Sequence, residues 1–322
     1  MLLLPGCKNT PEPALVRRSQ PLLGTFVVIT AYGTNRAATH TAISAAFDEF
    51  RRIDSIMSLH RTDSELARLN AQAASVPVVV SSELFGVIRK AIEVAQRTDG
   101  FFDPTVAPLT KLWGFLWKEH RMPTESELAN VLPYVNYKLV ELGENSVRFR
   151  REGVSLDLNA IAKGYAVDYA IRKLREFSIT NTMVRAGGDL RVTGAPPGQR
   201  AWPVQIEDPG GKGSRLTIEL RDAAISTSGS YENYFVHGGT RYSHILNPKT
   251  GLPVPRVASC SVIAPTCMES DAWATACAVL GPDSAIARFG AEFPMLFASW
   301  TSVGALRFEK SASFPATKPP LD

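Results

Sequence analysis

The segment LDLNAIAKGYAVDYAIRKL, residues 156–174, places a carboxylate, an amide, a lysine and a glycine at one predicted strand-to-helix junction. Asp157 and Asn159 end an alternating apolar stretch that is typical of a strand, and Lys163 and Gly164 fall in the first turn of the predicted helix. The free N–H groups and the positive dipole of a helix start bind anions. The junction is therefore a candidate phosphate site. The alternative is a capped helix with a solvated lysine.

A second chemical pattern occurs in ESDAWATAC, residues 269–277. Asp271 and Thr275 are four residues apart on a predicted helix, so the carboxylate and the hydroxyl share one face. Two such oxygens suit magnesium, which proteins hold with one or two carboxylates plus phosphate oxygens and waters. In the structural alternative, Asp271 serves the helix N-terminus near Ser270 and Thr275 packs inside.

Further polar clusters interrupt apolar segments. DGFFD, residues 99–103, lies in a predicted loop, and RAGGDL, residues 185–190, has two glycines inside a strand pattern, which indicates a bend or a close approach to a ligand. His244, in RYSHILNPKTG, is either a base near neutral pH or a packed, hydrogen-bonded histidine. The sequence has no nucleophile elbow, zinc-protease, Walker or GxGxxG motif. The spacing of these residues alone therefore favours a phosphate-binding protein, and it leaves magnesium dependence open.

The order of the predicted elements indicates an α+β architecture. A strand over 24–32, helices over 41–57 and from 82 to 95, and a hairpin over 147–158 precede a helix that ends near 177. The second half is rich in strands and contains a helix over 270–280 and strands over 295–300 and 305–309. Because helices and strands are partly segregated, we expect a mostly antiparallel or mixed sheet in one domain, residues 21–322.

Composition narrows the class of protein. The chain has 322 residues, 45% hydrophobic and 20% charged, so it can bury a large core. The net charge of +4 is small, and the densest basic groups, at 17–18, 51–52 and 148–151, are interpreted as solvated surface residues. We expect no nucleic-acid partner. No stretch reaches the length of about 18 apolar residues that a transmembrane helix requires.

The N-terminus, MLLLPGC, ends in a small residue followed by Cys7, as in bacterial lipoprotein signals. The basic region and most of the apolar region of such a signal are absent, so we interpret residues 1–20 as a truncated signal and a tether. This predicts a periplasmic protein with a lipid on Cys7, anchored to the inner membrane. The spacing of Cys260, Cys267 and Cys277 does not fit a zinc site. Buried free thiols are expected, although one pair could form a disulfide.

Taken in order, these clusters resemble one family. The segments are LGTFVVI, MSLHRTDSELARLN, DGFFDPTVAPLTKLWGF, LDLNAIAKGYAVD, RAGGDL, ISTSGSYENYF, HILNPKTG and ESDAWATA, and they span residues 23–281. The chain resembles the ApbE family of FAD:protein FMN transferases. The resemblance implies a T-fold-like α+β domain with a mixed, mostly antiparallel sheet flanked by helices. It also implies magnesium-dependent transfer of FMN from FAD to a threonine hydroxyl of an acceptor protein, with release of AMP.

The resemblance assigns roles to individual positions. It implies that magnesium is held by Asp271, Thr275 and the backbone carbonyl of Ala160, and that His244 is the candidate base. The FAD-site residues that it implies are Leu23, His60, Phe101, Phe102, Asp103, Asp157, Lys163, Gly187, Gly188, Asp189 and His244. Leu23 and His60 depart from the methionine and tyrosine that are common in the family, and an imidazole at position 60 would stack more weakly on a flavin.

Rival functions stay open at this point. An FAD pyrophosphatase would use water in place of threonine and release FMN and AMP. A flavin-binding carrier lipoprotein would bind FAD without turning it over. A membrane-tethered structural scaffold would not explain the glycine-containing segments AKG and GGD. The acceptors expected from the family are redox-driven pump subunits and periplasmic electron carriers that contain a threonine flavinylation motif.

Overall fold

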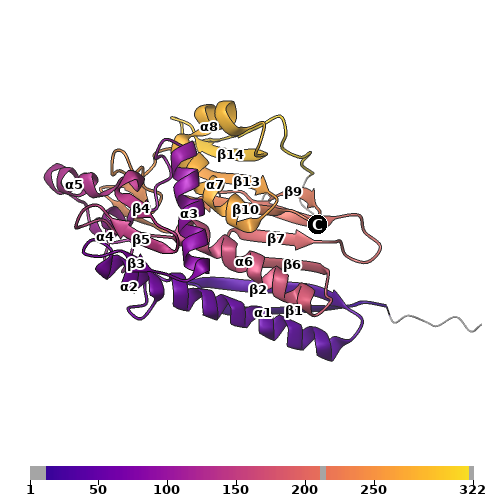
Figure 1. Ribbon diagram of the computed structural model, residues 1–322. Helices are drawn as coiled ribbons and strands as arrows, with labels where there is room; N and C mark the ends of the chain where they lie inside the picture. The colour runs from indigo at the N-terminus through magenta and orange to yellow at the C-terminus, as the bar shows by residue number, and fades with distance from the viewer. Residues whose placement is uncertain (1–11, 211–214, 319–322) are drawn as a thin grey trace, which may run out of the picture.

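The main sheet organises the molecule. The structure is a computed structural model that describes residues 12–210 and 215–318. The main sheet has eight strands in the order β1-β2-β6-β7-β10-β13-β14-β15, and every ladder between these described strands is antiparallel. Figure 1 shows these strands side by side from β1 to β14. The strands are Ala14–Leu22 (β1), Thr25–Gly33 (β2), Asn181–Ala186 (β6), Asp189–Thr193 (β7), Ala224–Gly229 (β10), Val257–Ala264 (β13), Met295–Trp300 (β14) and Leu306–Lys310 (β15). The predicted α+β class is confirmed.

One face of the sheet is covered by helices, which lie in front of the strands in Figure 1. The helices are Arg36–Met57 (α1), Asn159–Glu176 (α6) and Cys267–Leu280 (α7), with Ser82–Arg97 (α3) packed on α6 and α7, and Pro282–Phe289 (α8) following α7. In α1, Ile43, Phe47 and Phe50 recur at helical spacing and are fully buried. This apolar face is the one that the sequence predicts, and it packs on β1 and β2.

A smaller lobe extends from one end of the sheet (left in Figure 1). It contains a three-stranded sheet in the order β3-β5-β4 and a cluster of buried aromatic and aliphatic side chains around Trp113. Its elements are Glu65–Gln72 (α2), Val78–Val79 (β3), Ala107–Leu112 (α4), Glu125–Val131 (α5), Val140–Leu142 (β4), Ser146–Phe149 (β5) and the 3-10 turns Leu132–Tyr134 and Tyr137–Leu139. The hairpin Tyr234–His237 (β11) and Thr240–Ser243 (β12) packs against this cluster through Phe235 and Tyr242.

The opposite face of the main sheet carries the hairpin Trp202–Glu207 (β8) and Arg215–Leu220 (β9). Trp202, Val204 and Ile218 of this hairpin form a separate core with Val192 and Ile225 of the sheet. The prediction of helices flanking the sheet therefore holds for one face, whereas the other face packs on a β-hairpin.

Several predicted boundaries are wrong. The tether was expected to reach residue 20, but residues 14–22 form β1, which pairs along its whole length with β2. The hairpin over 147–158 does not form, because β5 pairs with β4 and β3, and the backbone over 150–158 joins no sheet. Helix α1 begins at Arg36 rather than near 41, and α7 begins at Cys267 rather than near 270. Cys7 lies outside the described residues.

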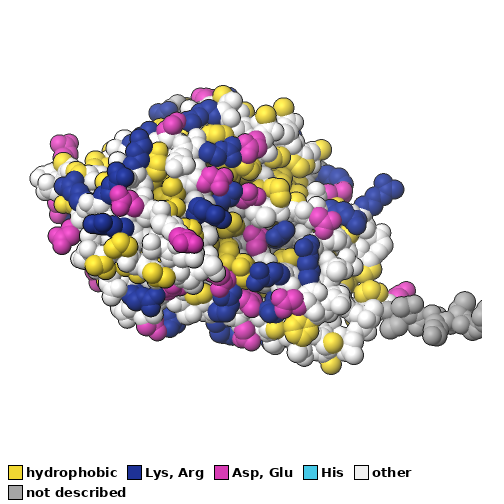
Figure 2. Space-filling view, in the orientation of Figure 1, with side chains coloured by type: hydrophobic (Ala, Val, Ile, Leu, Met, Phe, Trp, Pro, Cys, Tyr) yellow, Lys and Arg dark blue, Asp and Glu magenta, His cyan; other side chains and the backbone are white. Residues whose placement is uncertain are grey.

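The structure agrees with the predictions made for the charged surface groups and for the cysteines. In Figure 2 basic and acidic side chains are intermixed over the visible face, and Arg51 and Arg52 form ion pairs with Asp48 and Glu49, as expected for a solvated surface. The cysteines at 260, 267 and 277 are buried and free, so the thiol prediction is confirmed. Within the part of the chain that the structure describes, no helix has the length and apolarity needed to cross a bilayer.

Candidate active site

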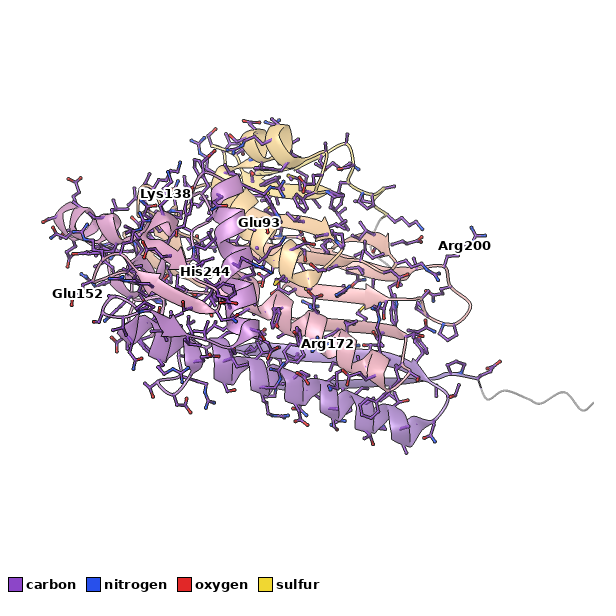
Figure 3. The ribbon with its side chains drawn as sticks, viewed as in Figure 1. Glu93, Lys138, Glu152, Arg172, Arg200 and His244 are labelled. Atoms are coloured by element: carbon purple, nitrogen blue, oxygen red, sulfur yellow. The ribbon has the colours of Figure 1, made fainter. Side chains whose placement is uncertain are left out.

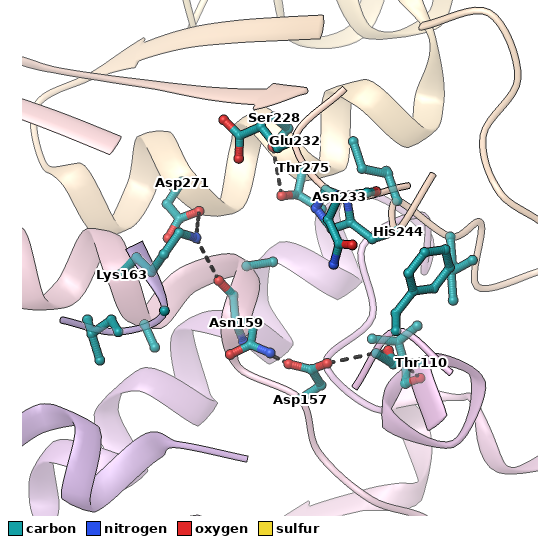
Figure 4. Close-up of a pocket in the computed structure, with 18 of the residues that line it drawn as sticks. Thr110, Asp157, Asn159, Lys163, Ser228, Glu232, Asn233, His244, Asp271 and Thr275 are labelled. Atoms are coloured by element: carbon teal, nitrogen blue, oxygen red, sulfur yellow. Dashed lines mark hydrogen bonds and ion pairs between the residues drawn. The ribbon is translucent and has the colours of Figure 1, made fainter. Parts of the chain in front are cut away.

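A cavity of about 650 Å³ lies where the main sheet, the helical layer and the smaller lobe meet. Figure 4 shows its polar side chains, which come from α4, from α6 and the segment before it, from α7, from β10 and the loop after it, and from the loop after β12. In Figure 3 His244 lies well inside the outline of the molecule, while labelled residues such as Glu152 and Arg200 lie at its periphery. A cavity of this size can enclose a ligand of several rings.

The antiparallel crossing of α6 and α7 creates the polar end of this cavity. Both backbone N–H groups that open α7, at Cys267 and Met268, donate to the Asp168 carboxylate at 2.9 Å. One turn earlier in α6, the Gly164 N–H donates to Asp271 Oδ2 at 2.9 Å. The two helices run antiparallel, so these contacts pair earlier residues of α6 with later residues of α7. By the same progression, the turn of α6 that contains Ala160 comes beside the turn of α7 that follows Asp271.

Gly164 is what permits the close crossing. A Cβ there would lie 2.2 Å from the Cys267 carbonyl oxygen and 2.8 Å from the Asp271 Cβ. Only a glycine therefore lets the two backbones approach, and this approach brings the Asp271 carboxylate to α6. The structural alternative, in which Asp271 serves the N-terminus of its own helix, does not hold, because Thr266 caps α7 and Asp271 accepts a hydrogen bond from α6.

Lys163 sits between two carboxylates at this crossing. Its Nζ lies 3.2 Å from Asp189 Oδ2 and 3.7 Å from Asp271 Oδ1, and it donates to the Asn159 carbonyl at 3.0 Å. Burial alone would lower the pKa of Lys163, but Asp189 and Asp271 outweigh it and raise the pKa above its ordinary value. Lys163 is therefore a permanent cation in a pocket that remains open to a ligand.

The oxygens of this corner suit a hard cation. Asp271 is 3% exposed, and burial together with the nearby Asp189 raises its pKa to about 7 in spite of Lys163. A divalent cation would relieve this cost by holding the carboxylate ionised. The Thr275 hydroxyl, one turn along, hydrogen-bonds Ser228 Oγ at 3.0 Å and also lines the cavity. Asp271, Thr275 and Ala160 line the same cavity, and the carboxylate and hydroxyl oxygens are of the kind that holds magnesium together with phosphate and water.

Asp157 opens helix α6 from an extended segment that lacks a partner strand. The segment is held by Asn70, whose side chain makes both hydrogen bonds of a strand-like pair with the backbone of Leu156, and by a 2.7 Å bond from the Asp157 N–H to the Pro104 carbonyl. Asp157 Oδ1 accepts the Asn159 N–H at 2.9 Å, and Oδ2 accepts the Thr110 hydroxyl at 3.4 Å. Burial raises its pKa. The predicted strand before this junction is wrong; the predicted helix forms, but it begins at Asn159, so Lys163 and Gly164 fall in its second turn.

The DGFFD loop is more structural than predicted. The Asp103 carboxylate accepts the Thr105 N–H, the Thr105 hydroxyl and the Tyr137 N–H, so its oxygens hold the loop together. Its pKa is raised by burial. Phe102 is 4% exposed and belongs to the main core, whereas Phe101 borders the cavity under Lys249 Nζ, which lies 4.2 Å from the ring centroid.

His244 lines the cavity, and one of its two ring nitrogens is hydrogen-bonded to the backbone. Its Nδ1 lies 3.0 Å from the carbonyl oxygen of Asn233, which also accepts the His244 backbone N–H. A carbonyl only accepts, so Nδ1 carries the proton and Nε2 is left as the acceptor. Burial, with a smaller contribution from Lys163, lowers the pKa of His244 below its ordinary value. The imidazole is thus held neutral and oriented, which is what a general base needs.

The remaining predicted residues are at the rim. Leu23, at φ 51° in the β1–β2 turn, and His60, edge-on to Trp117, both line the cavity. Gly188 and Asp189 line it as well, but Gly187, in the β6–β7 turn, does not. Sequence reasoning missed the roles of Ser228, Glu232, Asn233 and Thr110, since polar residues in loops carry no positional pattern until the fold brings them together.

The fold and the site together define a class: an α+β protein with a large ligand cavity that combines a cluster of carboxylate and hydroxyl oxygens, a fixed lysine and a neutral histidine. The chain belongs to the ApbE family, whose model matches residues 23–295.

Similar proteins agree with this assignment. A FAD:protein FMN transferase from Treponema pallidum is 34% identical over 86% of this chain and 82% of its own length. One from Vibrio cholerae is 34% identical over 98% of this chain and 96% of its own. The solved structure of flavin transferase ApbE from Vibrio cholerae has a TM-score of 0.83 and 32% identity over 94% of this chain and 98% of that chain. The ApbE protein from Thermotoga maritima has a TM-score of 0.85 and 32% identity over 93% and 98%.

Proposed function

We propose that this chain transfers FMN from FAD to a threonine hydroxyl of an acceptor protein, with magnesium, and releases AMP. The observation that carries the proposal is the α6–α7 crossing, which places the Asp271 carboxylate, the Lys163 ammonium and the Thr275 hydroxyl in the cavity that His244 also lines. Magnesium, when bound, would neutralise charge on the diphosphate and orient the leaving group.

The chain's own residues account for the other requirements of the reaction. Lys163 is a fixed cation for a phosphate oxygen, and Asp189 and Asn159 hold it in place. The threonine oxygen bonds to the FMN phosphorus while the bond from that phosphorus to the bridging oxygen breaks, and AMP leaves with that oxygen. The threonine proton passes to Nε2 of His244. Orientation and electrostatic stabilisation supply most of the catalysis in phosphoryl transfer of this kind.

The acceptor and the cellular location are part of the proposal. The acceptor is a redox-pump subunit or a periplasmic electron carrier with a threonine flavinylation motif. The sequence Leu4-Pro5-Gly6-Cys7 supports a lipid on Cys7 and a periplasmic location at the inner membrane. Labelling of cells with a fatty acid tests this, because the label on the wild-type chain should disappear in a Cys7→Ser variant.

The test of the reaction is incubation with FAD and magnesium, with and without an acceptor protein, and with a chelator control. Mass spectrometry should find FMN added to an acceptor threonine and an equal amount of AMP. If AMP and free FMN appear at the same rate without acceptor, the chain is an FAD pyrophosphatase. If FAD stays bound and intact, the chain is a carrier.

A further inference from the structure

A second cavity, of about 490 Å³, lies on the helix-free face of the main sheet. Side chains of β2, β6 and β7, including Val28, Met183 and Leu190, form its floor. The β8–β9 hairpin forms one wall, through Trp202 and Val204. We call this cavity the outer groove. The site described above does not account for it.

The outer groove adjoins the active-site cavity. Gly188, Thr227 and Glu232 line both. Gly188 packs closely on its neighbours here, since a Cβ on it would lie 2.6 Å from the Thr227 carbonyl oxygen and 3.3 Å from Glu232 Oε1. The next residue, Asp189, is the one that contacts Lys163 at 3.2 Å. The junction between the two cavities is therefore adjacent to the proposed phosphate site.

The same junction leads to the proposed base. Glu232 is followed in the chain by Asn233, whose carbonyl fixes His244 Nδ1 at 3.0 Å. Figure 4 shows Glu232, Asn233 and His244 along one side of the active-site cavity. A hydroxyl that enters beside Glu232 would thus reach the side of the cavity from which a proton can pass to His244 Nε2.

This inference rests on the function proposed above, because that reaction needs a macromolecular substrate that enters while FAD fills the main cavity. We propose that the outer groove binds an extended segment of the acceptor protein, and that its threonine reaches the FMN phosphorus through the junction at Gly188. The chemistry of the groove suits a peptide: an apolar floor and a rim with charges of both signs, Arg17, Arg185 and Glu207, can accept alternating side chains.

The experiment fills the groove without touching the active-site cavity. Val28→Trp and Thr30→Trp place a strand-compatible ring on the groove floor, and neither residue lines the active-site cavity. The matched control is Val79→Trp on β3, which is 73% exposed and lines neither cavity. Each variant is assayed with FAD, magnesium and a flavin-free acceptor domain that contains the threonine motif. The measured quantities are KM for the acceptor, Kd for FAD and the circular dichroism spectrum, which reports folding. If one groove variant does not fold, the other still tests the proposal.

The expected result is a KM for the acceptor raised about tenfold or more in the groove variants, with Kd for FAD unchanged and the control like wild type. An unchanged KM in folded groove variants would overturn the docking site. A parallel rise in Kd for FAD would also overturn it and assign the groove to FAD. If the wild-type chain labels no acceptor and releases FMN and AMP, the transferase function fails and the groove loses its proposed occupant.

Discussion

Replacement of Gly164 by alanine tests the origin of the active site most directly. The new Cβ would lie 2.2 Å from the Cys267 carbonyl oxygen and 2.8 Å from the Asp271 Cβ. The first of these is backbone, so it cannot rotate away and α6 and α7 must separate. Overpacking of this kind costs about 1–3 kcal/mol. The same separation should move Asp271 away from the other proposed magnesium ligands.

Gly86 provides the matched control. It lies in the interior of α3, and nothing lies within 4 Å of a Cβ built there. Gly86→Ala should therefore gain about 0.5–1 kcal/mol, the usual advantage of alanine over glycine in a helix. The free energies of unfolding of the two variants should differ by about 1.5–4 kcal/mol in denaturant titrations.

The response to magnesium should show whether Gly164→Ala disturbs the magnesium site itself or only lowers the stability of the whole protein. A ligand that binds only the folded state stabilises it according to its concentration and Kd, so magnesium should raise the Tm of wild type and of Gly86→Ala. The rise in Tm should be smaller in Gly164→Ala, because the stabilisation free energy from magnesium at saturation falls by about 1.4 kcal/mol for each tenfold loss of affinity. Equal stability of the two alanine variants, with the same response to magnesium, would refute the argument that the α6–α7 contact builds the site.

Other predictions concern individual side chains. Asp271→Ala should abolish magnesium-dependent turnover and leave the circular dichroism spectrum unchanged, since Lys163 keeps its contact with Asp189; wild-type activity in magnesium would contradict the metal assignment. Because burial lowers the pKa of His244 below 6.5, kcat/KM at saturating magnesium, which keeps Asp271 ionised, should fall only as the pH drops below 6.5, and an acidic limb above that value under these conditions would exclude His244 as the base. His60→Tyr should lower Kd for FAD about two- to fivefold in a fluorescence titration through better stacking, and an unchanged Kd would show that residue 60 does not stack on the flavin.

Periodicity in the sequence predicted the elements that have one clear buried face. Helix α1 and helix α3 were found because their apolar residues repeat at helical spacing, and this repeat requires no knowledge of the partner. Strand β1 was missed because its polar residues, including Arg17 and Ser19, and Pro21 gave it the composition of a tether. It is an edge strand with one exposed face, so only its pairing with β2 reveals it.

The sequence by itself determined which chemical groups are present and in what order, and this order was enough to identify the family. Only the tertiary structure decided how those groups are used. Asp271 and Gly164 are 107 residues apart, and their contact depends on how closely two helix backbones pack. Asp103, a predicted FAD-site residue, does line the cavity, but the fold also uses its oxygens to accept hydrogen bonds from Thr105 and from the distant Tyr137. Spacing along a chain fixes local geometry, whereas contacts between distant segments are set by packing, which no local pattern encodes.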